Sequence, residues 1–161
     1  MFSPRYRWIF FVFQMLELLG WDADAPTVRC PDDPSWTEAS TREIAYMGML
    51  LLGWYTVTVR LGLGPWTVTS MLRRKECNDR RGGVPQSLHR ESDAMPREGA
   101  ALDADPMRDS DAETVRSRAD EIPGILRSAT GWQTGVGVIV YPSGRIHLDV
   151  RPREPDFVDV R

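Results

Sequence analysis

The side chains that could bind a metal ion or act as nucleophile and base are few and far apart in the sequence. The chain has two cysteines and two histidines, which are Cys30, Cys77, His89 and His147. No two of them have the short spacing of a zinc motif, so the sequence predicts no metal site and no cofactor. Neither histidine adjoins a recognisable nucleophile motif. We therefore expect a protein that is not an enzyme.

A small enzyme is an alternative, because residues that are distant in the sequence can meet in a folded site. Arg145, His147 and Asp149 alternate along one expected strand, so their side chains would share one face of a sheet. They are the first candidates for such a site. The alternation also favours a solvated surface histidine at position 147, since this face is expected to lie toward water.

Two pairs of glycines have the spacing of a close backbone approach. Gly62-x-Gly64 follows an apolar stretch, as a dinucleotide-binding loop would, but Thr67 stands where the third glycine is needed. A strand pattern rather than a helix follows, which predicts a tight turn without a phosphate site. Gly135-x-Gly137 predicts a β-bulge or a close approach of another backbone.

The composition and charge are those of an ordinary globular protein. The chain has 161 residues and a net charge of −3, which fits one domain, or a small domain with a flexible segment. This net charge gives no overall attraction to nucleic acid or to anionic lipid. Lys75 is the only lysine among 20 basic residues, and this codon bias indicates a GC-rich genome of a bacterium, phage or virus.

A basic cluster lies just after the apolar part of the chain. Its members are Arg73, Arg74, Lys75, Arg80 and Arg81. No aromatic side chain lies between them to stack on bases, and only one Arg-Gly-Gly element is present. We therefore expect a solvated segment and no nucleic-acid partner.

The apolar N-terminal part covers residues 1–75. Residues 6–21 fit a strand that leads into a helix, or one helix that is buried on most sides. An acidic connector over 22–43 ends in a helix start, because Ser35 and Glu38 match a capping box. This helix is expected over 35–52 and to end near Gly53.

Two interpretations of the residues after Gly53 differ in fold and in location. The Val/Thr alternation predicts a β-hairpin with strands over 56–61 and 66–71 and a turn at 62–65. In the alternative, two apolar segments form a membrane-spanning hairpin flanked by arginines. These segments have about 14 and 16 residues, whereas a span needs about 20. The lengths favour the sheet, with interfacial membrane attachment as a further alternative.

Residues 76–109 are predicted to be a disordered linker or loop. They are rich in charged residues, glycine, proline and serine, and they contain no aromatic residue. Such a segment cannot bury enough apolar surface to offset the entropy lost on ordering.

Order is expected to resume in the C-terminal part, residues 110–161. Ser110 and Glu113 match a second capping box, and Pro123-Gly124 would kink or break the helix that follows. A hairpin is expected over 136–141 and 145–150, with a turn at 142–144. The apolar face of the helix would consist of Val115, Ala119, Ile122 and Leu126.

These patterns predict an α+β fold with a small antiparallel sheet of two hairpins, two or three helices and a long disordered loop. The C-terminal part would pack on the N-terminal part. We expect a cytoplasmic, non-enzymatic accessory or interaction protein, of viral or phage origin in one interpretation, that presents an apolar aromatic surface to a protein partner or a membrane face. An integral membrane two-helix hairpin with a cytoplasmic C-terminal domain is the alternative. The surface would consist of Trp8, Phe11, Trp21, Trp54 and Trp66.

Overall fold

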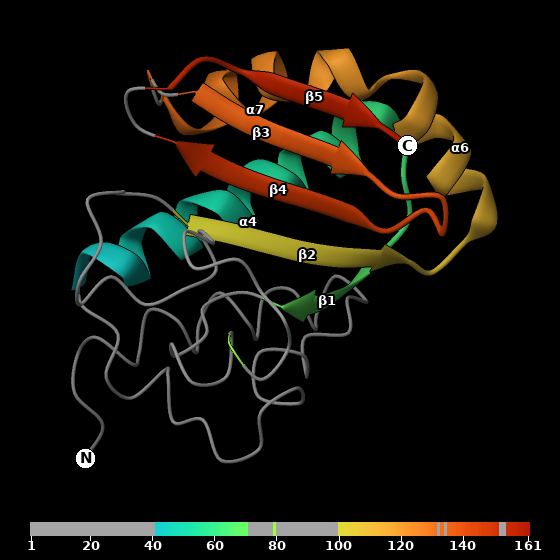
Figure 1. The fold of residues 1–161 in the computed structure, drawn as a ribbon, viewed down its shortest axis with the longest axis horizontal. Helices are drawn as coiled ribbons and strands as arrows, with labels where there is room; N and C mark the ends of the chain where they lie inside the picture. Colours follow the sequence, from blue (N-terminus) through green and yellow to red (C-terminus); the bar gives the residue numbers. More distant parts are fainter. Residues whose placement is uncertain (1–40, 71–78, 80–99, 132, 134, 152–153) are drawn as a thin grey trace.

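The computed structural model describes residues 41–70, 79, 100–131, 133, 135–151 and 154–161. The side chains of these residues are described except those of 41–47 and 100. Three α-helices, one 3-10 turn and five strands lie in these ranges (Figure 1). In chain order the elements are α4 (Thr41–Leu61), β1 (Trp66–Ser70), β2 (Ala100–Pro106), α6 (Asp109–Ser117), η1 (Ala119–Glu121), α7 (Ile122–Thr130), β3 (Gly135–Val140), β4 (Ile146–Arg151) and β5 (Phe157–Val160).

The fold is α+β, as predicted, and it is built on one five-stranded sheet with the order β1-β2-β4-β3-β5. The β1–β2, β2–β4 and β3–β4 pairs are antiparallel, whereas β3 and β5 are parallel. The sheet is therefore mixed and not antiparallel throughout. The helices lie behind one face of it, and the opposite face is turned toward the viewer in Figure 1.

Helix α4 runs through the residues for which the Val/Thr alternation predicted a strand, so the first predicted hairpin is wrong. A stripe of apolar residues at helical spacing is buried against the sheet and against α7. The threonines fit this helix because their hydroxyls donate to carbonyls one turn earlier, from Thr56 to Leu52 and from Thr58 to Tyr55. The stripe consists of Leu50, Trp54, Val57 and Leu61.

The glycines of this region have roles other than ending the helix at residue 53. Gly53 lies inside α4, and a Cβ there would come within 2.8 Å of Cγ of Leu126, so glycine permits close packing on α7. The helix ends at Gly62, whose φ of +68° places it in the left-handed region. The predicted turn at 62–65 exists, but it joins a helix to β1.

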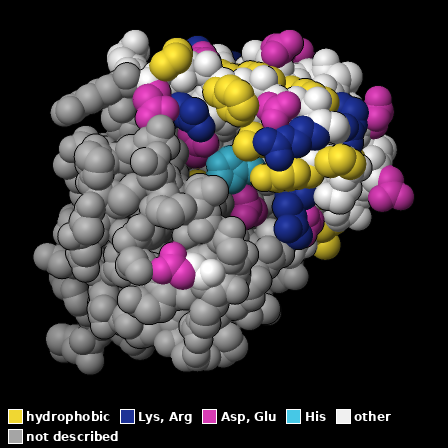
Figure 2. Space-filling view, viewed as in Figure 1, with side chains coloured by type: hydrophobic (Ala, Val, Ile, Leu, Met, Phe, Trp, Pro, Cys, Tyr) yellow, Lys and Arg dark blue, Asp and Glu magenta, His cyan; other side chains and the backbone are white. Residues whose placement is uncertain are grey.

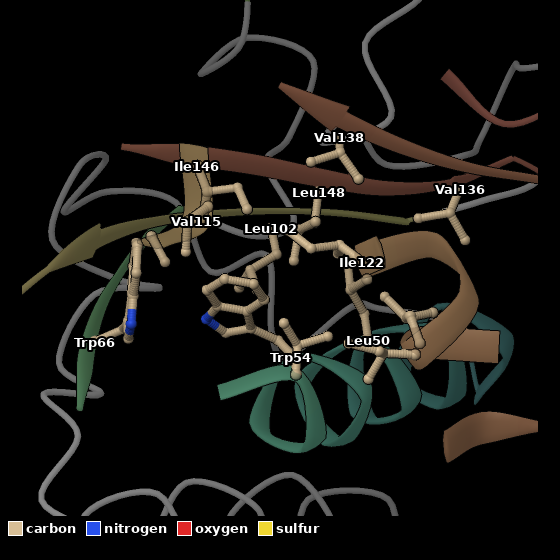
Figure 3. Packing of buried hydrophobic residues seen from close by; sticks show 14 of the residues in the cluster. Leu50, Trp54, Trp66, Leu102, Val115, Ile122, Val136, Val138, Ile146 and Leu148 are labelled. Atoms are coloured by element: carbon tan, nitrogen blue, oxygen red, sulfur yellow. The ribbon is translucent and has the colours of Figure 1, made fainter. Parts of the chain in front are cut away.

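Two of the tryptophans expected on a surface lie in the core instead. Trp54 and Trp66 are each 0% exposed, and their rings meet edge to face with centroids 5.0 Å apart. Figure 3 shows the edge of Trp54 directed toward Trp66 among the aliphatic side chains of the sheet. Among the residues that the structure describes, neither indole N–H finds a hydrogen-bond partner. The pair joins α4 to β1, so neither residue is available to a partner.

Strand β2 lies inside the segment predicted to be a disordered linker, and the C-terminal boundary of that prediction is wrong. Leu102 and Ala104 are buried, while Asp103 and Asp105 alternate with them onto the other face of the sheet. The strand is central, because it pairs with β1 on one side and with β4 on the other. Apart from Asp79, residues 76–99 lie outside the described part of the chain.

The apolar helical face predicted over residues 115–126 is confirmed. Its members Val115, Ala119, Ile122 and Leu126 are all buried. The helix is broken, as predicted, but at the η1 turn, and Pro123 lies in the first turn of α7.

The second predicted capping box is wrong. Helix α6 begins at Asp109, after an N-cap at Arg108 that makes no side-chain cap hydrogen bond. The buried Asp111 carboxylate instead accepts from the Arg108 guanidinium and from the backbone N–H of Gly64, at 3.0 Å. The Gly64 amide, which a phosphate loop would have offered to a ligand, is thus held by a carboxylate.

The C-terminal hairpin is confirmed as strands β3 and β4, with Gly144 at φ +83° in the turn. The close approach predicted at Gly135 is present, because a Cβ there would collide with the Glu154 carbonyl oxygen. The β3–β4 register is continuous, so no bulge occurs at these glycines.

Several predicted features lie outside the described residues. They are the Ser35 helix start, Cys30, Cys77, His89, Trp8, Phe11, Trp21 and the basic cluster Arg73, Arg74, Lys75, Arg80 and Arg81. Within the ranges that the structure describes, no helix combines the length and the apolar character that a membrane crossing needs.

Candidate functional site

The face of the sheet away from the helices carries a row of charged side chains on β4 and β2. Alternation along β4 directs Ile146, Leu148 and Val150 into the core. The residues between them point to the opposite face, as the sequence predicted. Figure 2 shows this face, with the single described histidine among charged side chains of both signs and hydrophobic side chains nearby.

His147 is held between two aspartates that come from different strands. Its Nδ1 lies 2.8 Å from Oδ1 of Asp103 on β2, and its Nε2 lies 3.2 Å from Oδ2 of Asp149 on β4. The imidazole side chain is only 15% exposed, so the expectation of a solvated surface histidine at position 147 is wrong. Since both ring nitrogens face carboxylate oxygens, the arrangement favours the imidazolium form, in which both nitrogens donate.

Asp149 is held on its other side by Arg151. The guanidinium donates through Nε and Nη2 to the two carboxylate oxygens, both at 2.6 Å. This bidentate geometry is the strongest form of the arginine–carboxylate pair. Glycine at position 137 of β3 makes room for the pair, because a Cβ there would overlap the Asp149 carboxylate.

Arg145 belongs to a separate ion pair on the same face. Its Nε and Nη2 donate to Asp105 at 2.7 and 2.9 Å. Of the three residues expected to form an enzyme site, the structure thus joins His147 directly to Asp149, whereas Arg145 is paired elsewhere. The network around the histidine consists of Asp103, His147, Asp149 and Arg151, and we call it the His147 network.

The electrostatics of the His147 network follow from its burial and its hydrogen bonds. Burial alone would lower the pKa of His147, but the hydrogen bonds to Asp103 and Asp149 outweigh it and raise the pKa to about 9. Burial would raise the pKa of Asp149, but the hydrogen bonds from Arg151 and His147 lower it to about 2. His147 is therefore protonated at neutral pH, and Asp149 is ionised.

This geometry does not suit His147 as a general base. A base at neutral pH needs a free ring nitrogen and a pKa near 7. Both nitrogens of His147 face carboxylates, and its pKa lies well above that range. Among the residues that the structure describes, no group of three or more His, Cys, Asp or Glu side chains is arranged to hold a metal ion. The His147 network is a buried set of ion pairs that connects β2 to β4.

The sequence predicted only part of the His147 network. The alternation of His147 and Asp149 was visible, but Asp103 and Asp105 lie in a segment whose composition predicted disorder. Leu102 and Ala104 alternate with these two aspartates, and this short pattern was the available signal for a strand.

The second candidate feature is the outer edge of β5, the last strand of the sheet order. The Arg161 N–H donates to the Val140 carbonyl at 2.9 Å, so the backbone groups of Arg161 and, by alternation, Asp159 point toward β3. Those of Val158 and Val160 therefore point outward. No strand in the described part of the chain pairs with this edge.

Exposed apolar side chains and stacked arginines lie beside this edge. Phe157 is 42% and Val160 is 44% exposed. Arg151 lies over the Phe157 ring and Arg161 over the Tyr141 ring, each with the guanidinium carbon 5.5 Å from the centroid. Aromatic and arginine side chains are enriched in protein interfaces.

Comparison with known proteins gives no relative for this chain. No protein-family model, no curated protein and no solved structure matches it.

Proposed function

We propose that this chain is a non-enzymatic protein-interaction module that binds another protein chain along the outer edge of β5. The observation that carries the proposal is this edge, with which no described strand pairs and whose backbone groups at Val158 and Val160 point outward. An extended chain that pairs with such an edge gains main-chain hydrogen bonds, and side chains beside the edge provide specificity.

The side chains near the edge support this proposal. Phe157 and Val160 are among the few large hydrophobic side chains that are exposed in the described residues. They take the place of Trp54 and Trp66 as the apolar surface offered to a partner. The charged groups described on β2 and β4 are paired with one another within the chain.

Site-specific photo-cross-linking in the cells that naturally make the protein tests the proposal. A benzophenone amino acid at position 160 is expected to form an adduct with a protein. The matched control carries it at Val59, which is 60% exposed on α4, and is expected to form none. Equal labelling at both positions, or none at 160, would contradict the proposal.

A backbone variant sharpens this test. Val160→Pro removes one outward N–H, a change that an edge strand tolerates when that N–H faces away from its neighbour. We expect the variant to fold and to lose the adduct formed by a cross-linker at Phe157. Retention of that adduct would show that the partner does not pair with the β5 backbone.

A further inference from the structure

We infer that the chain bound at the β5 edge is a second copy of this protein, paired antiparallel about a two-fold axis at Val160. The inference rests on the proposed function, since it names the partner for the same edge. Two-fold dimers are the commonest symmetric assemblies, and they need a surface that is complementary to itself. The end of β5 has this property.

The backbone permits this pairing. The N–H and C=O of Val160 both point outward, so Val160 and its counterpart in the second copy can exchange two hydrogen bonds across the axis. The exposed Val160 side chains would then lie next to each other on the helix side of the joined sheets. Two five-stranded sheets would become one continuous sheet.

The charges select the register. With the axis at Val160, each Asp159 lies opposite an Arg161 of the other copy, which gives two cross-strand pairs of opposite charge. An axis at Asp159 would place two carboxylates opposite each other. An axis at Val158 would place Phe157 opposite Asp159 and leave both charges without a cross-strand partner.

The two charged side chains are already held in position within one chain. Arg161 Nε donates to Asp159 Oδ2 at 2.7 Å, and its guanidinium lies over Tyr141. Both therefore lie on the same face of β5 before the second copy binds. Charged residues on an edge strand often prevent association, but one residue of each sign at this spacing repels only in the wrong registers.

The dimer is expected to be weak, because a contact through one short strand is small. We expect a dissociation constant in the micromolar range or above, so sedimentation velocity should be followed over protein concentrations up to about 0.5 mM. The natural chain should shift from monomer to dimer over this range.

Charge reversal tests the register directly. Asp159→Arg places four arginines at the axis and Arg161→Asp places four aspartates there, so each variant should dimerise at least about tenfold more weakly. An equimolar mixture of the two should form a heterodimer, and the double variant Asp159→Arg/Arg161→Asp should dimerise like the natural chain. Asp109→Arg makes the same charge change on exposed α6 and should have no effect.

Each outcome supports or overturns the inference. Circular dichroism and thermal unfolding establish first that every variant is folded. A natural chain that stays monomeric overturns the inference, and so do single reversals that dimerise normally or a mixture that does not associate. If the chain is monomeric but a cross-linker at 160 still captures a different protein, the inference fails and the proposed function stands.

Discussion

The tripeptide Asp-Val-Arg occurs twice in this chain and forms an Asp–Arg ion pair in each of two different surroundings. Arg151 pairs with Asp149 on β4, and Arg161 pairs with Asp159 at the end of β5. The Asp149 side chain is 3% exposed, whereas Asp159 and Arg161 are 32% and 52% exposed. Solvent screens an exposed pair and leaves it little net free energy. The comparison therefore predicts that the first pair determines stability and that the second is free to serve recognition.

The largest effect is expected from the residue at the centre of the buried pair's network. His147→Leu removes the cation between Asp103 and Asp149 and leaves both carboxylates without it. Breaking a buried ion pair in this way destabilises a protein by about 3–5 kcal/mol. Urea unfolding measures the free energy of unfolding. Asp109→Leu, at an exposed site on α6, is the control and should change it little.

Removal of the arginine from each copy of the tripeptide tests directly whether the two ion pairs differ in their contribution to stability. Arg151→Met should lower the free energy of unfolding by about 3 kcal/mol, because the bidentate partner of a buried carboxylate is lost. Arg161→Met should lower the free energy of unfolding by less than about 1 kcal/mol. Both variants are measured at low protein concentration, where dimer formation cannot contribute. Equal losses would show that burial does not distinguish the two pairs.

The pH dependence of stability should report the same buried network. The pKa of His147 is raised from 6.5 to about 9, so the folded chain keeps a proton that the unfolded chain has lost. The stability that this group contributes is complete below about pH 6.5, falls as pH rises, and is lost above the folded pKa. Since one pKa unit corresponds to about 1.4 kcal/mol, the loss is about 3 kcal/mol. His147→Gln should lack this decline in urea unfolding between neutral and alkaline pH.

Acid unfolding tests the carboxylate of the network in the opposite direction. The pKa of Asp149 is lowered from 3.8 to about 2, so its contribution to stability is present above the ordinary value and is lost as pH falls through about 2. An Asp149→Asn variant that unfolds in acid like the natural chain would contradict this assignment.

A single methyl group beside the buried pair is expected to have a smaller effect than the loss of His147 or Arg151. Gly137→Ala places a Cβ against the Asp149 carboxylate, and overpacking of this kind destabilises by about 1–3 kcal/mol. Gly124→Ala is the matched control, since a Cβ in this exposed turn of α7 meets no atom within 4 Å. It should be neutral or stabilise by up to about 1 kcal/mol. Thermal unfolding ranks the two variants.

The parts of the fold that the sequence predicted are those in which local pattern and tertiary packing agree. The β3–β4 hairpin has strands of alternating polarity around a short turn, and the helical face from Val115 to Leu126 has regular spacing. Both signals lie within about twenty residues and need no distant partner to be recognised.

Predictions failed where distant residues decide the structure. Residues 56–61 alternate like a strand, but Val57 and Leu61 also belong to a helical stripe, and packing of Trp54 on Trp66 favours the helix. Strand β2 lies in a polar segment and becomes recognisable only through its pairing with β4. Asp103 on β2 contacts His147 on β4, which is 44 residues later in the sequence. No local pattern indicates which carboxylates will meet the histidine.

The central position of β2 also has a consequence for the rate of folding. The β3–β4 hairpin closes over a few residues and can form early, whereas β2 must find β4 across a long stretch of chain that includes α6 and α7. Strand β1 can join the sheet only through β2. Formation of the β2–β4 contact therefore costs the most loop-closure entropy and is expected to limit the rate of folding. Substitutions in β2 should consequently slow folding more than they speed unfolding.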